Sequence, residues 1–543
     1  MYKFIVFFLS FWMLGCSSYN TVDQTPSVKG EMKDTDNWYD DMKDMVLPMR
    51  LTIPQPNDYN CTDVNNTDGL ERSCTLADVD SDVDATDDYK PVLHVNIQTD
   101  DFVSNQSFMN ASFQIKGKST RRAEQKSYRI KLDSKEDLYR GERTFQLNKH
   151  PYDDSRVRNK LSFDLFRSIP NFPSMKTEFI HLEINGIDYG LYTHVEKVGK
   201  EYLINRGWNE DDNLYKAQDF AFLIYDELKM DSKGKPVDPD AFDSRLEIES
   251  GKDHTALDNM LKDINNPKAD FQETFEKYFN RDNYLTWMAI NIILGNKDTI
   301  SQNFYLYNPK YSETFYFLPW DYDGAYRDLT RLMKWQYGIG NWWGIPLHRR
   351  FLSIEENRND LYKMVEKIKT EYITPEIVQN HLDTYRPLIE NYLLREPDDM
   401  RYEKWDTEFN ILIPRIEEVV EAYEAEFGHP MPYWIGAAYE DKTLSLHWGK
   451  SVDLEGDLII YRLQVSSSPD MSNSFIDEDV EEVFTKDDEN IYYEKEIALE
   501  PGIYYMKVVA REIANPDHYQ AGFNKEVRVD GLKQPGVLEF EVK

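Results

Sequence analysis

The spacing of hydrophobic residues divides the chain into three regions. Between residues 91 and 216, hydrophobic and polar residues alternate over short runs, which predicts β-strands. Over residues 254–294 and 354–427 the hydrophobic residues recur every three or four positions, which predicts helices. Short strand-like runs return after residue 434. The pattern predicts an α+β domain over residues 91–430, followed by a β-sandwich domain over residues 434–543.

Two turns in the first region predict β-hairpins. Asn185-Gly186 lies between two strand-like runs within residues 179–195, and Asn-Gly is a strong hairpin signal. The second turn, Gly117–Lys126, contains a glycine and is rich in lysine and arginine. In such a turn Arg121 and Lys126 are able to neutralise a triphosphate. By composition alone, a basic surface hairpin is the better interpretation of this segment.

A helix is predicted after Asp154 and Ser155, which are good N-cap residues. Its hydrophobic residues fall on one face, and Pro170 ends it. Arg158 lies one turn into this helix and away from the hydrophobic face. It is therefore placed to reach a phosphate or an acidic partner.

The segment from residue 295 to residue 324 concentrates the candidate chemistry. A predicted helix ends at Gly295, and two strand-like runs within residues 304–318 predict a hairpin. The hairpin brings polar side chains of the loop before it close to those that follow it: Asp298, Asn303, Asp321 and Asp323.

These residue types and their order are typical of phosphoryl transfer by protein kinases. A carboxylate such as Asp298 accepts the proton of the substrate hydroxyl, and oxygen ligands such as Asn303 and Asp321 hold Mg²⁺. The spacing alone is weak, because the chain is rich in Asp and Asn. On spacing alone, an acidic surface hairpin remains the better interpretation.

This segment resembles the corresponding part of the spore-coat protein H (CotH) kinase family. Further stretches resemble that family in the same order along residues 91–350: Pro91–Ile97, Gly117–Arg121, Lys126–Leu132, Asp154–Leu161 and Asn185–Val198. The resemblance implies a two-lobed, atypical protein-kinase-like domain. It also implies an enzyme that transfers the γ-phosphate of ATP to serine or threonine of a protein substrate, with ATP and Mg²⁺ as cofactors.

The resemblance also implies roles for individual residues. Asp298 is the catalytic residue, which accepts or orients the substrate hydroxyl. Asn303 and Asp321 hold the metal, and Asp323 assists them. Glu196 lies in a stretch that resembles the linker between the lobes, where adenine docks. Arg121, Lys126 and Arg158 are candidates for contact with the phosphates of ATP from their own positions in the basic turn and the helix, and the resemblance adds little support for them.

The first residues predict a bacterial lipoprotein. The apolar run over residues 4–14 is too short to span a bilayer comfortably and is typical of a signal peptide. Gly15-Cys16 follows it and resembles a lipobox, so residues 1–15 are expected to be a signal peptide and Cys16 the lipidated residue. This predicts attachment to the cell envelope, at the outer membrane or cell surface of a Gram-negative bacterium. An ordinary signal peptide is the alternative.

Residues 16–90 are polar and acidic, and they predict a tether. In an exported protein Cys61 and Cys74 are expected to form a disulfide. The run Asp78–Asp88 alternates aspartate with other residues, as calcium loops do, but it lacks the glycine and glutamate of an EF-hand. A solvated charge run is the preferred interpretation, and calcium binding stays open.

The charge of the chain restricts its partners. A formal net charge of −35 and a pI near 4.7 exclude nucleic acid as an expected ligand and favour basic proteins, such as a basic, Ser/Thr-rich substrate. Contact with the membrane is expected through the N-terminal lipid only.

Two other classes of function remain open. The first is a non-enzymatic surface scaffold or adhesin that uses a kinase-like fold to bind protein or glycan. The second is a carbohydrate-active enzyme with paired aspartates. The C-terminal region resembles a fibronectin type III-like sandwich, for which spacing or adhesion is the expected role.

Overall fold

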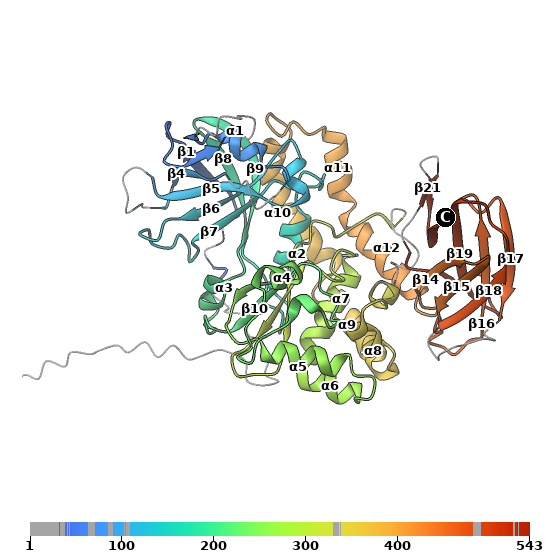
Figure 1. Ribbon diagram of the computed structural model, residues 1–543. Coiled ribbons are helices and arrows are strands. Elements are labelled where there is room, and N and C mark those ends of the chain that lie inside the picture. Colours follow the sequence, from blue (N-terminus) through green and yellow to red (C-terminus); the bar gives the residue numbers. More distant parts are fainter. Residues whose placement is uncertain are drawn as a thin grey trace, which may run out of the picture.

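The computed structural model shows a β-barrel, a part built from a sheet and helices, and a separate β-rich C-terminal region (Figure 1). It describes residues 32, 38–40, 42, 44–62, 71–84, 91–102, 104, 109–329, 336, 338–481, 490–524, 527–529 and 532–543. The predicted signal peptide and Cys16 lie outside the described residues. The predicted fold class, α+β with a following β-rich domain, is confirmed.

The N-terminal strands close into a barrel in the order β1-β4-β5-β6-β7-β9-β8. Alternate residues such as Val95, Phe113 and Ile130 are buried inside it and form a core of their own. Both predicted hairpins form, as β5–β6 and β8–β9. The strands are β1 (Val46–Thr52), β4 (Leu93–Thr99), β5 (Ala111–Lys116), β6 (Ser127–Leu132), β7 (Thr144–Asn148), β8 (Thr177–Ile184) and β9 (Ile187–Glu196).

Strand β1 corrects the predicted tether and the predicted domain start at residue 91. It pairs antiparallel with β4 and parallel with β8, so it closes the barrel. Its residues Met49 and Leu51 are buried in the barrel core. The folded domain therefore includes residues that the sequence assigns to a tether, because their pairing partners lie far along the chain.

The segment after β1 is also folded onto the barrel. It contains β2 (Asn60–Thr62), β3 (Glu71–Ser73) and α1 (Leu76–Ser81), and a disulfide with an S–S distance of 2.02 Å joins Cys61 to Cys74. Asp78 and Asp82 are buried here, so the prediction of a solvated charge run is wrong for these two residues, whereas Asp84 is exposed. Residues 85–88 of the run lie outside the described residues.

The second part is built on a four-stranded sheet in the order β11-β10-β12-β13. The predicted hairpin over residues 304–318 is formed by β12 and β13. The strands are β10 (Asn213–Ala217), β11 (Leu246–Ser250), β12 (Phe304–Asn308) and β13 (Tyr316–Pro319). The helices are α2 (Arg158–Phe166), α3 (Lys200–Asn205), α4 (Pro239–Arg245), α5 (Thr255–Ile264), α6 (Phe271–Tyr278), α7 (Arg281–Ile293), α8 (Pro346–Leu352), α9 (Glu355–Glu371), α10 (Pro375–Leu393), α11 (Tyr402–Asn410) and α12 (Leu412–Ala425), with 3₁₀ turns at Ser119–Arg122, Asp226–Leu228 and Gly338–Trp342.

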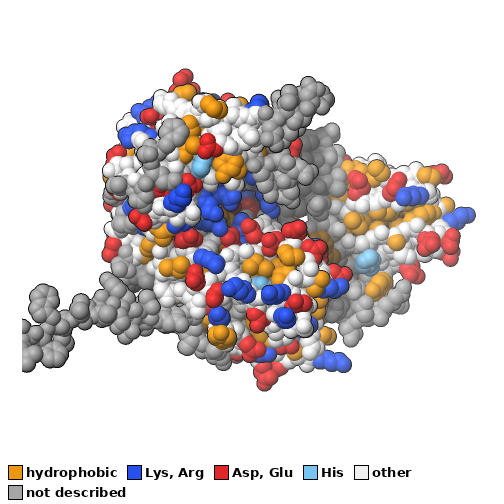
Figure 2. All heavy atoms as spheres, turned by 60° about the vertical axis from the view of Figure 1, so that its left-hand side comes forward, with side chains coloured by type: hydrophobic (Ala, Val, Ile, Leu, Met, Phe, Trp, Pro, Cys, Tyr) orange, Lys and Arg blue, Asp and Glu red, His pale blue; other side chains and the backbone are white. Residues whose placement is uncertain are grey.

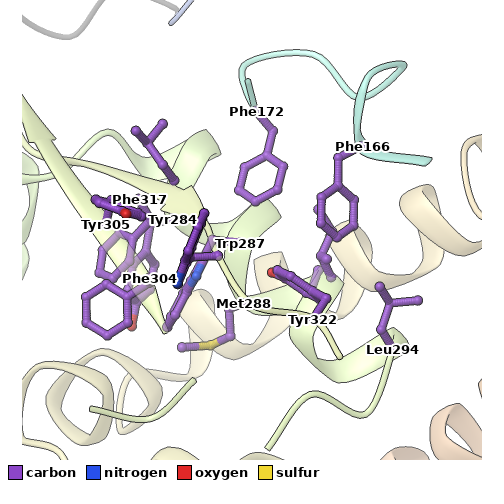
Figure 3. Packing of buried hydrophobic residues seen from close by; sticks show 14 of the residues in the cluster. Phe166, Phe172, Tyr284, Trp287, Met288, Leu294, Phe304, Tyr305, Phe317 and Tyr322 are labelled. Carbon is purple, nitrogen blue, oxygen red and sulfur yellow. The ribbon is translucent and has the colours of Figure 1, made fainter. Parts of the chain in front are cut away.

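Helix α7 packs against the β12–β13 hairpin and fixes its position (Figure 3). The ring of Trp287 lies 4.4 Å from that of Phe317, centroid to centroid. Asn283 on the same helix donates to the backbone carbonyl of Phe317 and accepts from its N–H, at 3.1 and 2.7 Å. The helix before the loop and the strand after it belong to the same hydrophobic core, which therefore fixes both ends of the loop between α7 and β12.

The C-terminal region consists of two sheets that share a hydrophobic core, with Trp448 and Leu463 among its buried residues. The sheets have the orders β14-β15-β18 and β17-β16-β19-β20, and β23 also pairs with β19. The first strand begins at Ile435, next to the predicted boundary. The strands are β14 (Ile435–Glu440), β15 (Thr443–Gly449), β16 (Ile459–Ser466), β17 (Ser474–Val480), β18 (Asn490–Glu496), β19 (Gly502–Glu512), β20 (Tyr519–Ala521) and β23 (Val537–Val542), with a separate pair β21 (Val527–Val529) and β22 (Leu532–Gln534).

No helix in the described parts of the chain combines the length and apolar character that crossing a bilayer requires. The likeness of the C-terminal region to fibronectin type III domains stays a prediction.

Candidate functional site

A cavity of about 890 Å³ lies between the barrel and the sheet of the second part. Figure 2 shows lysine and arginine side chains gathered where the surface is hollowed between these two parts. The cavity is lined from both sides, and residues that matter for its chemistry are Lys116, Arg121, Arg129, Asn148, His150, Arg158, Lys216, Glu247, Glu249, Asp298, Asn303, Trp320, Asp321, Asp323 and Arg327. The structure thus brings Asp298, Asn303, Asp321 and Asp323 to one cavity.

Asp298 lies in the loop between α7 and β12. Arg327 holds one of its carboxylate oxygens, with Nη2 at 2.6 Å from Oδ2. Burial raises the pKa of Asp298, the charge of Arg327 opposes this, and the charge of Asp323 adds to it. A carboxylate with a raised pKa and one oxygen fixed by an arginine is suited to accept a proton at its other oxygen.

Asp321 and Asp323 follow the end of β13. Burial, and then the charge of Asp323, raise the pKa of Asp321 to about 7, while the charges of Lys116, His150 and Lys216 lower it. For Asp323, burial also raises the pKa, but the hydrogen bond and the charge of His150 prevail and lower it below its usual value. The Nδ1 atom of His150 lies 3.7 Å from Asp323 Oδ2. The two neighbouring carboxylates therefore carry like charge at a desolvated position.

The backbone at two of these positions is left-handed. Asn303 has a φ of 60° and Asp321 a φ of 57°. Such conformations are uncommon for residues other than glycine, and Asn and Asp tolerate them best. Strained backbone of this kind is concentrated at functional sites, which agrees with the position of both residues in the cavity.

Cations from three strands line the cavity together with these carboxylates. Lys116 at the end of β5 donates to Asn148 Oδ1 at 2.5 Å, and Lys216 on β10 lies 3.6 Å from Glu247. Both ammonium groups lie 5.8 Å from the ring centroid of Trp320, the residue before Asp321. Burial lowers the pKa of Lys116 to about 8, and the charge of Asp321 opposes this.

Arg129 on β6 adds a third cation to the cavity. Burial lowers the pKa of Arg129, and the charges of Glu249 and Glu247 oppose this shift. No pattern in the sequence marks Lys116, Lys216 or Arg129 as residues of the site. A single lysine or arginine within a strand gives no signal of its own, although Lys116 ends the strand before the predicted basic turn.

Of the four residues expected to contact ATP, two line the cavity. Arg121 lies in the turn after β5 and pairs with Asp82. Arg158 opens α2 and pairs with Asp153 and Glu408, each at 3.2 Å.

The structure does not bring the other two to the cavity. The ammonium of Lys126 donates to the backbone carbonyl of Arg121 at 2.7 Å. Glu196 is buried, and Arg206 donates to both of its carboxylate oxygens, at 2.9 and 3.0 Å. Its position gives Glu196 a structural ion pair instead of a contact with a nucleotide.

The fold and the site define the class of the protein: an α+β protein with a cleft lined by both carboxylates and cations. The family model described as "CotH kinase protein" matches residues 113–424, more than half of the chain. The chain therefore belongs to the CotH kinase protein family, and the family predicted from the sequence is confirmed.

One characterised relative is the inner spore coat protein H of Bacillus subtilis (strain 168). It is 29% identical to this chain over 311 residues, which cover 56% of this chain and 82% of the relative.

Two solved structures align with the chain at low similarity. The Helicobacter pylori proinflammatory kinase CtkA is 11% identical, with a TM-score of 0.25, and the alignment covers 55% of this chain and 94% of that one. The Shewanella oneidensis MR-1 toxin–antitoxin complex of HipA, HipB and operator DNA is 13% identical, with a TM-score of 0.24, covering 62% of this chain and 66% of that one. TM-scores this far below 0.5 support no inference about this chain.

Proposed function

We propose that this protein is an atypical protein kinase that transfers the γ-phosphate of ATP to a serine or threonine hydroxyl of a protein substrate. The observation that carries the proposal is the meeting of Asp298, Asp321 and Lys116 in one cavity of about 890 Å³. Membership of the CotH kinase protein family supports the same activity. The net charge of −35 favours a basic substrate.

The donor set of the cavity fits Mg²⁺. Asn303, Asp321 and Asp323 offer amide and carboxylate oxygens, and Mg²⁺ prefers a few such ligands together with water and phosphate oxygens. The raised pKa of Asp321 marks a carboxylate that its protein neighbours do not fully neutralise. Mg²⁺, when bound there, supplies positive charge to both the carboxylates and the phosphates.

The cations of the cavity fit a triphosphate. Lys116, Arg129 and Lys216 come from β5, β6 and β10 and all line the cavity. Three cations at a partly desolvated position attract a polyanion strongly, because the low dielectric increases each interaction. These residues orient the nucleotide in this proposal, and Arg121 and Arg158 are placed to add to them.

Asp298 receives the proton of the acceptor hydroxyl. Arg327 holds its Oδ2 atom, and Oδ1 has no donor among the described residues, so Oδ1 is the atom that faces the hydroxyl. Because burial raises the pKa of Asp298, the carboxylate is a stronger base than an exposed aspartate.

The test is label transfer by the full-length protein. Purified protein with [γ-³²P]ATP and Mg²⁺ is expected to label itself and a basic, serine-containing peptide, and EDTA is expected to abolish both signals. The labelled residue is expected to be phosphoserine or phosphothreonine. Tight binding of Mg-ATP without any transfer would instead support a kinase-like scaffold, and absence of both would overturn the proposal.

We further propose that a lipid on Cys16 anchors the protein to the cell envelope. The apolar run over residues 4–14 and the Gly15-Cys16 pair support this. Cys16→Ser is expected to move the protein from the membrane fraction to the soluble fraction of a Gram-negative host. Wild-type protein that stays soluble in such a host would contradict the anchor.

A further inference from the structure

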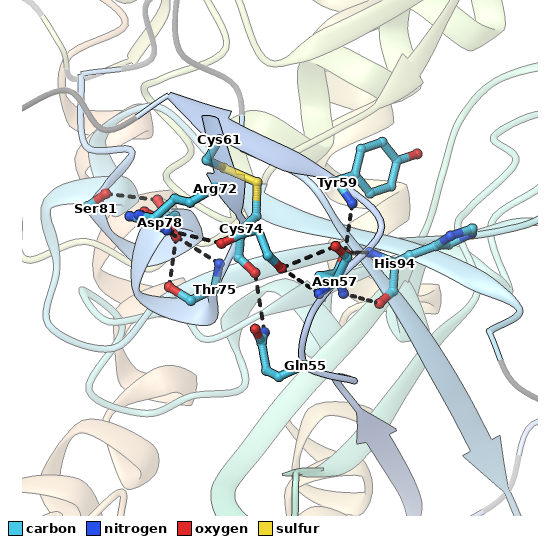
Figure 4. The surroundings of a disulfide bond; sticks show 11 residues. Gln55, Asn57, Tyr59, Cys61, Arg72, Cys74, Thr75, Asp78, Ser81 and His94 are labelled. Atoms are coloured by element: carbon cyan, nitrogen blue, oxygen red, sulfur yellow. Dashed lines mark hydrogen bonds and ion pairs between the residues drawn. A yellow bond between two sulfur atoms is a disulfide. The ribbon is translucent and has the colours of Figure 1, made fainter. Parts of the chain in front are cut away.

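Helix α1 is an acidic segment that the structure fixes beside the cavity. The Cys61–Cys74 disulfide anchors its start, and the backbone N–H of Cys74 donates to the carbonyl of Tyr59 at 2.9 Å (Figure 4). Asp78 binds both terminal nitrogens of Arg72, at 2.5 and 2.7 Å, and accepts from the N–H of Thr75 at 2.7 Å. The helix is therefore held by a covalent bond and by a cap of its own.

The same helix is tied to the barrel wall. Tyr128 on β6 donates its hydroxyl to Asp80 Oδ1 at 2.9 Å. Helix α1 also contacts β5, the strand that leads into the basic turn Gly117–Lys126. The end of α1 thus lies next to this turn.

Asp82, directly after α1, binds Arg121 of the turn. Arg121 Nη1 donates to the carboxylate of Asp82 through a short ion pair, and also approaches the carbonyl of Asp82 at 3.4 Å. Arg121 Nε donates to the carbonyl of Gly117 at 2.5 Å. The side chains of Asp82 and Arg121 are 5% and 14% exposed, so the pair is largely shielded from solvent.

These contacts leave part of the guanidinium open. Among the described residues nothing accepts a hydrogen bond from Arg121 Nη2, and both Arg121 and Asp82 line the cavity. An arginine held by its Nε and Nη1 atoms presents the remaining N–H groups at a fixed position, which lowers the entropic cost of binding an anion.

We propose that Asp82 is a positioning residue, which holds Arg121 so that its free N–H groups bind a phosphate of the nucleotide. This inference rests on the proposed kinase function. Asp82 lies outside residues 113–424, so the contact is not part of the region that the family model matches. Because the disulfide anchors α1, the affinity for the triphosphate depends on the oxidised state of Cys61 and Cys74.

Asp84 provides a matched control. It is two residues further along, and it pairs at 3.4 Å with Arg122, the neighbour of Arg121. Both side chains of this second pair are at least 70% exposed, and neither residue lines the cavity. Asp84→Asn therefore removes the same charge from the same segment without releasing Arg121.

The experiment compares full-length wild type, Asp82→Asn, Asp82→Glu and Asp84→Asn by calorimetry with Mg-ATP and with adenosine, and by the KM for ATP and kcat. Asp82→Asn is expected to raise Kd and KM for Mg-ATP about tenfold, the usual effect of weakening one charge-assisted hydrogen bond. Affinity for adenosine and kcat are expected to stay within about twofold. Asp82→Glu is expected to recover part of the affinity, and Asp84→Asn to match wild type.

Unchanged or tighter Mg-ATP binding by Asp82→Asn would overturn the inference, because Asp82 would then be neutral or would compete with the phosphate. An equal loss for adenosine and ATP would also overturn it, since that pattern indicates general damage to the fold. If wild type binds no ATP, the proposed function itself fails.

A second measurement tests the inference without the Asp82 variants, in case one of them does not fold. Reduction of wild type by a phosphine reductant is expected to raise Kd for Mg-ATP and to leave that for adenosine unchanged. The variant with both Cys61 and Cys74 replaced by alanine is expected to bind like reduced wild type and to be insensitive to the reductant. Equal affinities of oxidised and reduced wild type would count against a role for the anchored helix.

Discussion

Asp298 and Arg327 form a close ion pair in the lining of the cavity, with Arg327 Nη2 at 2.6 Å from Asp298 Oδ2. Arg327 Nε also donates to the carbonyl of Gly324 at 2.7 Å. A Cβ atom at Gly324 would lie 2.7 Å from Asp298 Oδ2, closer than real contacts allow. The glycine therefore lets the segment after β13 approach the loop before β12, and the arginine fastens the two together.

Asp298→Asn is expected to lower kcat about 10²- to 10⁴-fold, because the variant cannot accept the hydroxyl proton. Affinity for Mg-ATP is expected to stay close to that of wild type, since Asp298 contacts the acceptor in the proposed mechanism. Label transfer and calorimetry measure the two quantities. Equal kcat values for variant and wild type would contradict the assigned role.

Asp321→Ala is expected to show a different profile. Loss of an anionic ligand weakens the binding of Mg²⁺ and with it the binding of ATP, so the Mg²⁺-dependent thermal shift with ATP is expected to shrink. Asp328→Asn is the control, because Asp328 lines the same cavity but pairs with Arg415 at 3.4 Å. A normal thermal shift for Asp321→Ala would place the metal elsewhere.

The C-terminal region is expected to be dispensable for folding of the cavity. A chain of residues 32–433 is expected to unfold cooperatively and to bind Mg-ATP, because β14 begins only at Ile435. A chain of residues 91–433 is expected to be insoluble or unfolded, because it lacks β1 and exposes the edges of β4 and β8. Circular dichroism and gel filtration distinguish the two. Cooperative folding of the shorter chain would show that the barrel closes without β1.

Lys297 is expected to make the stability of the fold depend on pH. It is buried over the ring of Trp342, at 5.6 Å from the centroid, and burial lowers its pKa to about 7 from 10.5. At a pH between about 7 and 10.5, Lys297 is protonated in the unfolded chain and largely neutral in the folded one, so the unfolded chain binds more protons. Lys297 therefore makes the free energy of unfolding increase as pH rises from about 7 towards 10.5.

Lys297→Met is therefore expected to flatten the rise of the thermal midpoint between pH 7 and pH 9.5. Lys262→Met, at an exposed lysine on α5, is the control and is expected to keep the slope of wild type. The measurement is thermal unfolding followed by circular dichroism across that pH range. The same slope in all three proteins would mean that Lys297 is charged and solvated in the folded state.

Local signals explain what the sequence predicts well. Asn185 and Gly186 have φ values of 52° and 79°, the left-handed pair that an Asn-Gly hairpin turn requires, so neighbouring residues alone determine that hairpin. The hairpin at residues 304–318 is local in the same way, and it carries Asp321 to Asp298. The sequence therefore predicts four acidic or amide residues of the cavity: Asp298, Asn303, Asp321 and Asp323.

Long-range contacts explain what the sequence does not predict. Val46 pairs with Phe179, and nothing near β1 indicates that partner. Asp82 is a partner of Arg121 only because α1 folds back onto the barrel. Glu196 resembles a linker residue at the level of sequence, and only the buried Arg206 beside it reveals its structural role.

The parallel pairing of β1 with β8 has a consequence for how the chain acquires its structure during synthesis. Strand β1 is made early, yet one of its two neighbours is made only after β4, β5, β6 and β7. Until β8 emerges, one edge of β1 and the end of the growing sheet present unpaired backbone groups, and such edges are open to pairing with other chains. Closure of the barrel is therefore a late, non-local event that is slow compared with hairpin formation.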